Sequence, residues 1–193
     1  MTDDGRNYSN AQEGRHGNWM QTYSGRQFWP VDPRPSEVHL IDIAHGLAHA
    51  CRFAGHCSRF YSVAEHSVYV SQIVPPELAL VGLLHDATEA YVVDIPRPLK
   101  PFLTGYAAIE DGVWVAIAQR FGLPEKMPQA VKDADNALLL AEQRDIMAPP
   151  PAPWNIPGEA APIRIIGLDP ATAERVFLER FWQLAPMGRL LEA

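Results

Sequence analysis

The sequence predicts an all-α protein built as one domain, and three observations predict it. From residue 39 onward, apolar residues recur at spacings of three and four, which is the period of a helix. Proline and glycine divide this pattern into segments of helical length. The chain has 193 residues, 47% of them hydrophobic, which is enough to bury one core without cross-links.

The N-terminal part is predicted to differ from the rest. Residues 1–18 are rich in Gly, Asn, Asp and Arg and almost lack apolar residues, so we expect a flexible leader followed by a single domain over 19–193. The stretch "NWMQTYSGRQFWPVDPRP" then alternates large apolar and polar residues around Ser24 and Gly25. That alternation predicts a small hairpin or extended segment packed on the domain.

Three helices are expected next. "HLIDIAHGLAHACRF" has helical apolar spacing, with Asp42 as a candidate N-cap. "YSVAEHSVYVSQIV" is the second helix, ended by Pro75 and Pro76. "PELALVGLLHDATEAYV" is the third, and it begins with proline and glutamate as helix N-termini often do.

The second half of the chain has the same helical spacing of apolar residues, and no internal sequence repeat is apparent. "DIPRPLKP" is predicted to be an irregular connection, and "YAAIEDGVWVAIAQRF" a helix closed by Gly122 and Pro124. "MPQAVKDADNALLLAEQRDIM" predicts another amphipathic helix, followed by the proline-rich linker "APPPAPWNIPG". "DPATAERVFLERFWQL" predicts a closing helix with Asp169 as its cap and Pro170 in its first turn.

Charge and composition exclude some classes of partner. A net charge of −7 and a pI near 5.4 disfavour a polyanionic partner, so we expect no nucleic acid polymer and no acidic membrane surface. No apolar run approaches the length of a membrane span, and the N-terminus lacks a basic-then-apolar pattern, so a cytoplasmic location is expected. Cys51 and Cys57 are expected to be a reduced pair.

A group of polar residues lies where core residues are expected. In a helix, His85, Asp86 and Glu89 would share one turn. The same segment is otherwise apolar, so it should be wrapped by other elements, and an ionised aspartate there needs a partner of opposite charge.

Two further residues on other helices fit the same need. His66 is set among valines, and Asp135 precedes leucines at helical offsets, so both can point inward. Two imidazoles and two carboxylates from three helices would give one divalent cation, of Mn, Co, Fe or Zn, a mixed nitrogen and oxygen shell. The simpler alternative for either histidine alone is a buried imidazole bonded to a backbone carbonyl.

"YSVAEHS", "LLHDATEAYVVDIPRPLK" and "VKDAD" together resemble the HD-domain metal-dependent phosphohydrolases. Within that superfamily the chain looks like bacterial 5'-deoxynucleotidases and phage deoxynucleoside triphosphate hydrolases, over roughly residues 41–147. The resemblance implies an HD-domain helical bundle, a homo-oligomer and a small nucleotide as substrate. It also implies four metal ligands: His66, His85, Asp86 and Asp135.

The same resemblance suggests roles for the surrounding residues. Glu89 would orient or deprotonate the attacking water, and Asp94 would lie beside the reacting phosphate. The phosphate would be held by Arg52 and Lys100 with help from Lys132, and the base or sugar would be bordered by Phe53 and Pro98. Phe53 stands where near relatives are expected to carry tryptophan. From its closeness to Arg52 in sequence, His56 is either a substrate-side or ligand-supporting residue or a loop histidine.

Physical chemistry supports these roles for the metal ion and for the basic residues. A bound divalent ion lowers the pKa of water from about 15.7 to about 7. Arginine and lysine suit a dianionic phosphoryl group, although each of the three basic residues alone is more often a solvated surface charge. The expected function is therefore hydrolysis of a deoxynucleotide, at the 5'-monophosphate or the triphosphate, by metal-activated water. The alternative is a non-catalytic HD module that binds nucleotide or a protein partner.

The stretch "HGLAH" offers a competing metal site. His45 and His49 have the i, i+4 spacing of "HExxH" zinc enzymes, but the adjacent glutamate is missing, so this site is disfavoured. The sequence has no histidine after His85, whereas dinuclear HD-domain relatives use further ones. This absence favours a site for one metal ion.

Overall fold

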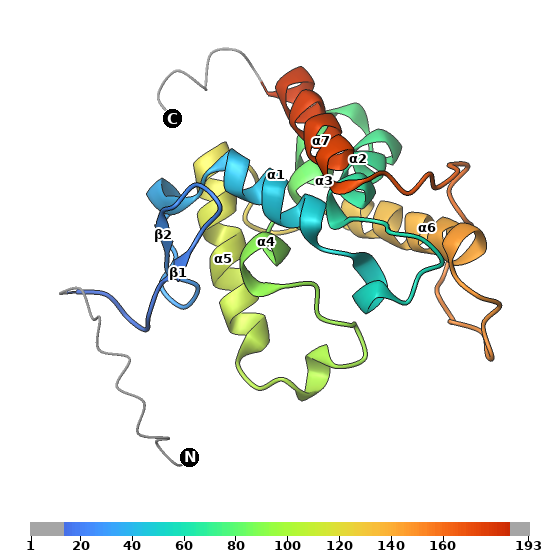
Figure 1. The fold of residues 1–193 in the computed structure, drawn as a ribbon, viewed down its shortest axis with the longest axis horizontal. Helices are drawn as coiled ribbons and strands as arrows, with labels where there is room; N and C mark the ends of the chain where they lie inside the picture. The colour runs from blue at the N-terminus through green and yellow to red at the C-terminus, as the bar shows by residue number, and fades with distance from the viewer. Residues whose placement is uncertain (1–13, 186–193) are drawn as a thin grey trace.

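The computed structural model describes residues 14–185 and is predominantly helical, which confirms the all-α prediction (Figure 1). A two-stranded hairpin precedes the helices, and α2 (Val63–Ile73) lies at the centre of the packing. It contacts α1 (Leu40–His49), α3 (Ala79–Leu84), α6 (Gln129–Ile146) and α7 (Pro170–Leu184). The division into a leader over 1–18 and a domain over 19–193 stays a prediction, and residues 1–13 and 186–193 lie outside the described residues.

The N-terminal hairpin is present where the alternating pattern placed it. β1 (Met20–Gln21) pairs antiparallel with β2 (Gln27–Phe28). Asp42 connects this hairpin to α1, because its carboxylate accepts hydrogen bonds from Ser24 N at 2.7 Å and Ser24 Oγ at 2.9 Å. The predicted role of Asp42 as N-cap was therefore wrong: His39 occupies that position, and Asp42 lies in the first turn.

Helix α2 begins and ends for local reasons. The Ser62 side chain caps it by accepting a hydrogen bond from Glu65 N at 3.1 Å. The helix stops before Pro75, because the residue preceding a proline is driven into the extended conformation, as Val74 is. Nearly the whole surface of α2 is buried, so the helix places His66 inside the protein.

We expect Ser62→Ala to lower the free energy of unfolding by about 1 kcal/mol, because the buried cap of α2 loses its acceptor. Urea unfolding with chelator present measures this loss. Ser58→Ala, at an exposed serine near the same loop, is the matched control and should change stability by less than about 0.5 kcal/mol. Equal effects of the two substitutions would contradict the capping role.

The predicted third helix is divided. A short 3-10 turn, η3 (Pro76–Leu78), leads into α3, which ends at Leu84, and α4 (Glu89–Val92) follows after a tight turn. The physical reason lies at Gly82, whose carbonyl would accept the next backbone bond of a regular helix but instead accepts a bond from His85 Nδ1 at 2.8 Å. Gly82 also lets α3 approach α2 closely, since a Cβ there would lie 3.3 Å from Ser71 Cα.

The remaining elements follow the predicted order. α5 (Tyr106–Phe121) ends at Gly122 in the left-handed conformation, and α6 and α7 lie within their predicted segments. Asp169 caps α7 by accepting from Thr172 N at 3.1 Å, which confirms that prediction. Three more short 3-10 turns lie between the helices and strands of the described residues. They are η1 (Pro35–Glu37) before α1, η2 (Arg52–Gly55) after α1 and η4 (Lys100–Phe102) before α5.

The structure also bears on the two cysteines and on membrane-spanning segments. Cys51 and Cys57 are free, with their Sγ atoms 3.8 Å apart, well beyond the roughly 2.05 Å of a disulfide bond. This agrees with the expected reduced pair. Within residues 14–185, no helix has the length and apolar character needed to cross a membrane.

Candidate metal centre

Four side chains from separate parts of the fold meet beside α2. His66 comes from α2, His85 and Asp86 from the turn after α3, and Asp135 from α6. His66 Nε2 lies 3.3 Å from His85 Nε2, 3.3 Å from Asp135 Oδ1 and 3.5 Å from Asp86 Oδ2. His85 Nε2 lies 3.3 Å from Asp86 Oδ1. The structure thus brings together all four residues that the sequence singled out as metal ligands.

Both imidazoles are fixed through their other nitrogen. His66 Nδ1 faces Glu142 Oε1 at 2.6 Å, and His85 Nδ1 faces the Gly82 carbonyl at 2.8 Å. Each Nδ1 therefore carries its proton, which leaves the lone pair of the neutral ring on Nε2. Two Nε2 lone pairs that face each other at 3.3 Å repel unless a proton or a cation lies between them.

The charges of the cluster favour a positive ion. Burial and the Arg52 charge lower the pKa of His66, but the Glu142 and Asp135 carboxylates raise it overall to about 9. Burial raises the pKa of Asp86 and of Asp135, yet the histidines lower both below their usual range. The centre therefore attracts a proton strongly, and a divalent cation would displace that proton.

The donor set fits a transition metal ion. One ligand atom from each of His66, His85 and Asp135 lies within 4.8 Å of the others, and Asp86 adds a fourth close carboxylate. Two imidazole nitrogens and two carboxylate oxygens suit Mn, Fe, Co or Zn. The side chains of Asp86 and Asp135 are 21% and 22% exposed, so water and a substrate can reach the centre.

Glu142 is a central residue that the sequence interpretation missed. Its side chain is fully buried and accepts hydrogen bonds from Tyr61 OH at 2.8 Å, His66 Nδ1 at 2.6 Å and Arg52 NH2 at 3.3 Å. Burial raises the pKa of Glu142, but the positive charges of Arg52 and His66 lower it overall. The signal was available, because Glu142 is seven residues from Asp135 and so shares its face of α6.

Arg52 connects this network to the metal centre. Its guanidinium lies 3.4 Å from Asp86 Oδ2 and 3.3 Å from Glu142 Oε2, and its Nε is buried without a hydrogen-bond partner. Phe53 and Ala54, which follow it, have φ of 55° and 50°, which is strained for residues with a Cβ. The backbone in this turn is therefore held out of its relaxed form beside the Arg52 guanidinium.

Glu89 and Asp94 lie in the electrostatic field of the same centre. Burial and the charges of Asp86 and Asp94 raise the pKa of Glu89 well above its usual range, and Glu89 Oε2 is buried without a partner. Burial also raises the pKa of Asp94, although the Arg52 charge lowers it. Val93 precedes Asp94 with φ 70° and ψ 148°, a strained conformation for a β-branched residue.

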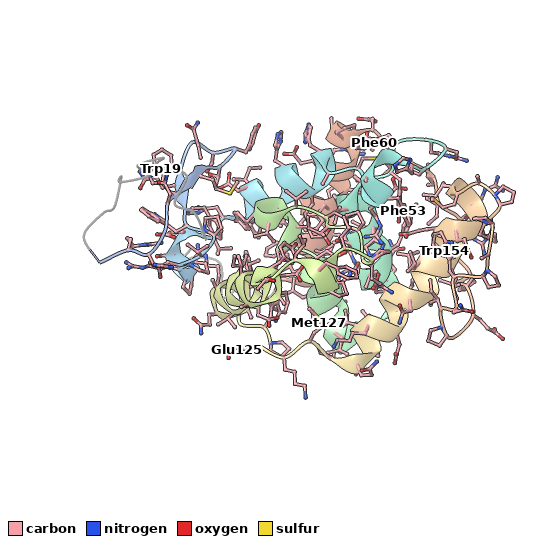
Figure 2. All side chains as sticks on the ribbon, turned by 90° about the horizontal axis from the view of Figure 1, so that it is seen from below. Trp19, Phe53, Phe60, Glu125, Met127 and Trp154 are labelled. Carbon is pink, nitrogen blue, oxygen red and sulfur yellow. The ribbon has the colours of Figure 1, made fainter. Side chains whose placement is uncertain are left out.

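The other predicted substrate residues differ in their surroundings. Lys100 is half-buried and pairs with Glu110 at 2.9 Å. Burial lowers the pKa of Lys100, but the carboxylates of Glu110 and Glu89 raise it overall. Phe53 lies close to Trp154 of the proline-rich linker, with ring centroids 6.1 Å apart (Figure 2). The remaining three are exposed at the surface: His56, Pro98 and Lys132.

Arg97 is a second basic residue that the sequence interpretation did not single out. Its side chain is 64% exposed and reaches Asp135 Oδ2 at 3.3 Å from the "DIPRPLKP" connection. Its position beside a carboxylate of the centre makes it a cation at the solvent side of the site. A signal existed in the sequence, since Arg97 lies three residues after Asp94 and three before Lys100.

The fold and the cluster define an α-helical protein with a candidate transition-metal centre of two histidines and two aspartates. No family model matches the chain. The chain is 40% identical over 175 residues to the uncharacterized protein YfdR of Escherichia coli K12, covering 89% of this chain and 98% of YfdR. It is 38% identical over 141 residues to an uncharacterized protein of Rhodobacter capsulatus, covering 65% of this chain and 72% of that protein. The chain therefore belongs to the YfdR family.

Proposed function

We propose that this protein is an HD-domain phosphohydrolase that uses one divalent metal ion to hydrolyse a phosphate bond of a deoxynucleotide. The observation that carries the proposal is the pair of Nε2 atoms, from His66 and His85, facing each other between two carboxylates. A bound cation would satisfy both Nε2 lone pairs and both carboxylates of this buried arrangement at once. When bound, the ion supplies a Lewis acid and lowers the pKa of water to about 7.

The residues around the centre support hydrolysis rather than binding alone. Glu89 offers a buried carboxylate oxygen without a partner and with a raised pKa, which suits a group that takes a proton from an attacking water. The oxygen of that water bonds to phosphorus, the bond from phosphorus to the nucleoside side breaks, and the leaving oxygen takes up a proton. An unpaired buried carboxylate oxygen in the field of Asp86 favours hydrolysis over a module that only binds.

The basic residues support a phosphate substrate. Arg52 and Arg97 each approach a carboxylate of the centre, at 3.4 Å and 3.3 Å, and Lys100 lies in the field of Glu89. A phosphate anion that enters the centre would compete for these cations, and arginine binds it in bidentate fashion. Phe53 and Trp154 provide aromatic surface near Arg52 for the base or sugar.

Phosphate release from a panel of deoxynucleoside mono- and triphosphates tests the proposal. We expect turnover with Mn²⁺ or Co²⁺ and less than about 1% of it with excess chelator, since the ion is what lowers the pKa of water to about 7. Product analysis separates release of phosphate from release of triphosphate. Binding of a nucleotide without hydrolysis, under every metal, would favour the non-catalytic module, and absence of both would contradict the nucleotide assignment.

A further inference from the structure

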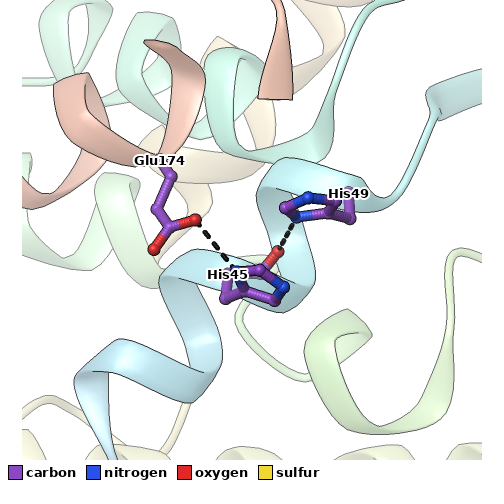
Figure 3. A group of neighbouring side chains, drawn as sticks. All are labelled: His45, His49 and Glu174. Atoms are coloured by element: carbon purple, nitrogen blue, oxygen red, sulfur yellow. Dashed lines mark hydrogen bonds and ion pairs between the residues drawn. The ribbon is translucent and has the colours of Figure 1, made fainter. Parts of the chain in front are cut away.

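A second group of potential metal ligands lies outside the centre described above. His45 and His49 come from α1, and Glu174 comes from the facing helix α7 (Figure 3). One donor atom from each residue lies within 4.8 Å of the others. The sequence disfavoured "HGLAH" because it lacks the adjacent glutamate base of "HExxH" enzymes, but the fold brings a third potential ligand, Glu174, to His45 from 129 residues away.

The three side chains are already held in place. His45 Nδ1 lies 3.0 Å from Glu174 Oε2, and His49 Nδ1 donates to the His45 carbonyl at 2.9 Å, which leaves the lone pair of His49 on Nε2. The His45 ring is stacked between Tyr23, at 3.5 Å, and His49, at 4.0 Å. Stacking on both faces limits the rotation of His45, so little order has to be gained when a ligand binds.

We propose that His45, His49 and Glu174 form a second site for a divalent transition metal ion, with Zn²⁺ as the first candidate, and that this ion joins α1 to α7. Two imidazoles and one carboxylate are a donor set that zinc uses in proteins, with water in the fourth position. The ion takes the place of the proton shared by His45 Nδ1 and Glu174 Oε2.

The distances and the exposure support this exchange. Two ligands about 2.0–2.1 Å from a tetrahedral ion lie roughly 3.3 Å apart, close to the 3.0 Å between His45 Nδ1 and Glu174 Oε2. The side chains of His45 and Glu174 are 28% and 19% exposed, so an ion can enter from solvent. His45 also borders a surface pocket of about 350 Å³ that Tyr23 and Asp42 line.

The site is independent of the proposed phosphohydrolase activity, because none of its three residues belongs to the His66 centre. It differs in chemistry as well, since it offers two imidazoles from one helix and a single carboxylate. Its expected consequence is structural: α7 packs against α1 and α2, and an ion between α1 and α7 would hold that helix in place.

Calorimetric titration of Zn²⁺ into the full-length, metal-free protein tests the site. We expect the wild type to bind two equivalents, His49→Ala one, and the His49→Ala, His85→Ala double variant none. His49 is exposed, so its replacement should leave the fold intact, which circular dichroism checks. Glu174→Gln should weaken the same equivalent at least tenfold. His16→Ala, at an exposed histidine outside both clusters, should still bind two equivalents.

The outcomes separate this proposal from the proposed function. If the His66 centre binds no Zn²⁺, the wild type binds one equivalent and His49→Ala binds none, and the second site stands. If His49→Ala retains every equivalent that the wild type binds, the second site is wrong, whatever the His66 centre does. In the His85→Ala variant, Zn²⁺ should also raise the thermal midpoint, because a ligand that binds only the folded state stabilises it.

Discussion

Glu142→Gln should lower the free energy of unfolding by about 3 kcal/mol and weaken metal binding by about 10- to 100-fold. The substitution keeps the shape of the side chain but removes the negative charge that faces Arg52 and His66 in a fully buried position. Arg52 loses its fully buried charge partner and keeps the more exposed Asp86, and His66 Nδ1 loses the carboxylate that orients the ring. Urea unfolding with chelator gives the first effect, and titration with Mn²⁺ gives the second.

The stability effect should depend on pH in a defined direction. The folded protein lowers the pKa of Glu142, so its pairing contributes stability above the usual value of 4.5 and loses it as the pH falls through the lower folded pKa. The difference between wild type and Glu142→Gln should therefore shrink in acid. Asp133→Asn, at an exposed carboxylate of the same helix, is the control. A loss no larger than that of the control would rule out the buried network as a source of stability.

Glu89→Gln should reduce turnover by about 10²- to 10⁴-fold while the protein keeps its metal. Glu89 Oε2 is buried and free of hydrogen bonds, so it is available for a proton, and a glutamine at this position cannot accept that proton as a base. The four groups that approach one another at the centre do not include Glu89, so metal content should be unchanged. Steady-state rates and metal analysis on the same sample measure both quantities.

Glu77→Gln is the matched control, because Glu77 is exposed on η3 and is not among the side chains that approach one another at the centre. It should retain wild-type turnover. Full activity in Glu89→Gln would show that another group takes the proton. Parallel loss of metal and activity would instead make Glu89 a ligand, and the assignment of the base would fail.

The helices could be predicted because their causes are local. Pro75 ends α2, Gly122 ends α5 and Asp169 caps α7, and each acts on backbone groups within a few residues. The four residues of the candidate metal centre were also predicted to meet, from polar residues in apolar helices and from the resemblance to HD-domain proteins. The structure brings their side chains together.

The misses share a different cause. Asp42 bonds to Ser24 of the hairpin rather than capping its own helix, and the third helix breaks where His85 bonds to the Gly82 carbonyl. Glu142 and Glu174 acquire their partners from helices 76 and 129 residues away.

The amino-acid sequence alone therefore determined the order and limits of the helices, through short-range backbone preferences. The partner of each buried carboxylate was chosen by how those helices pack, because a charge removed from water takes whichever opposite charge or donor the packing brings within hydrogen-bond distance.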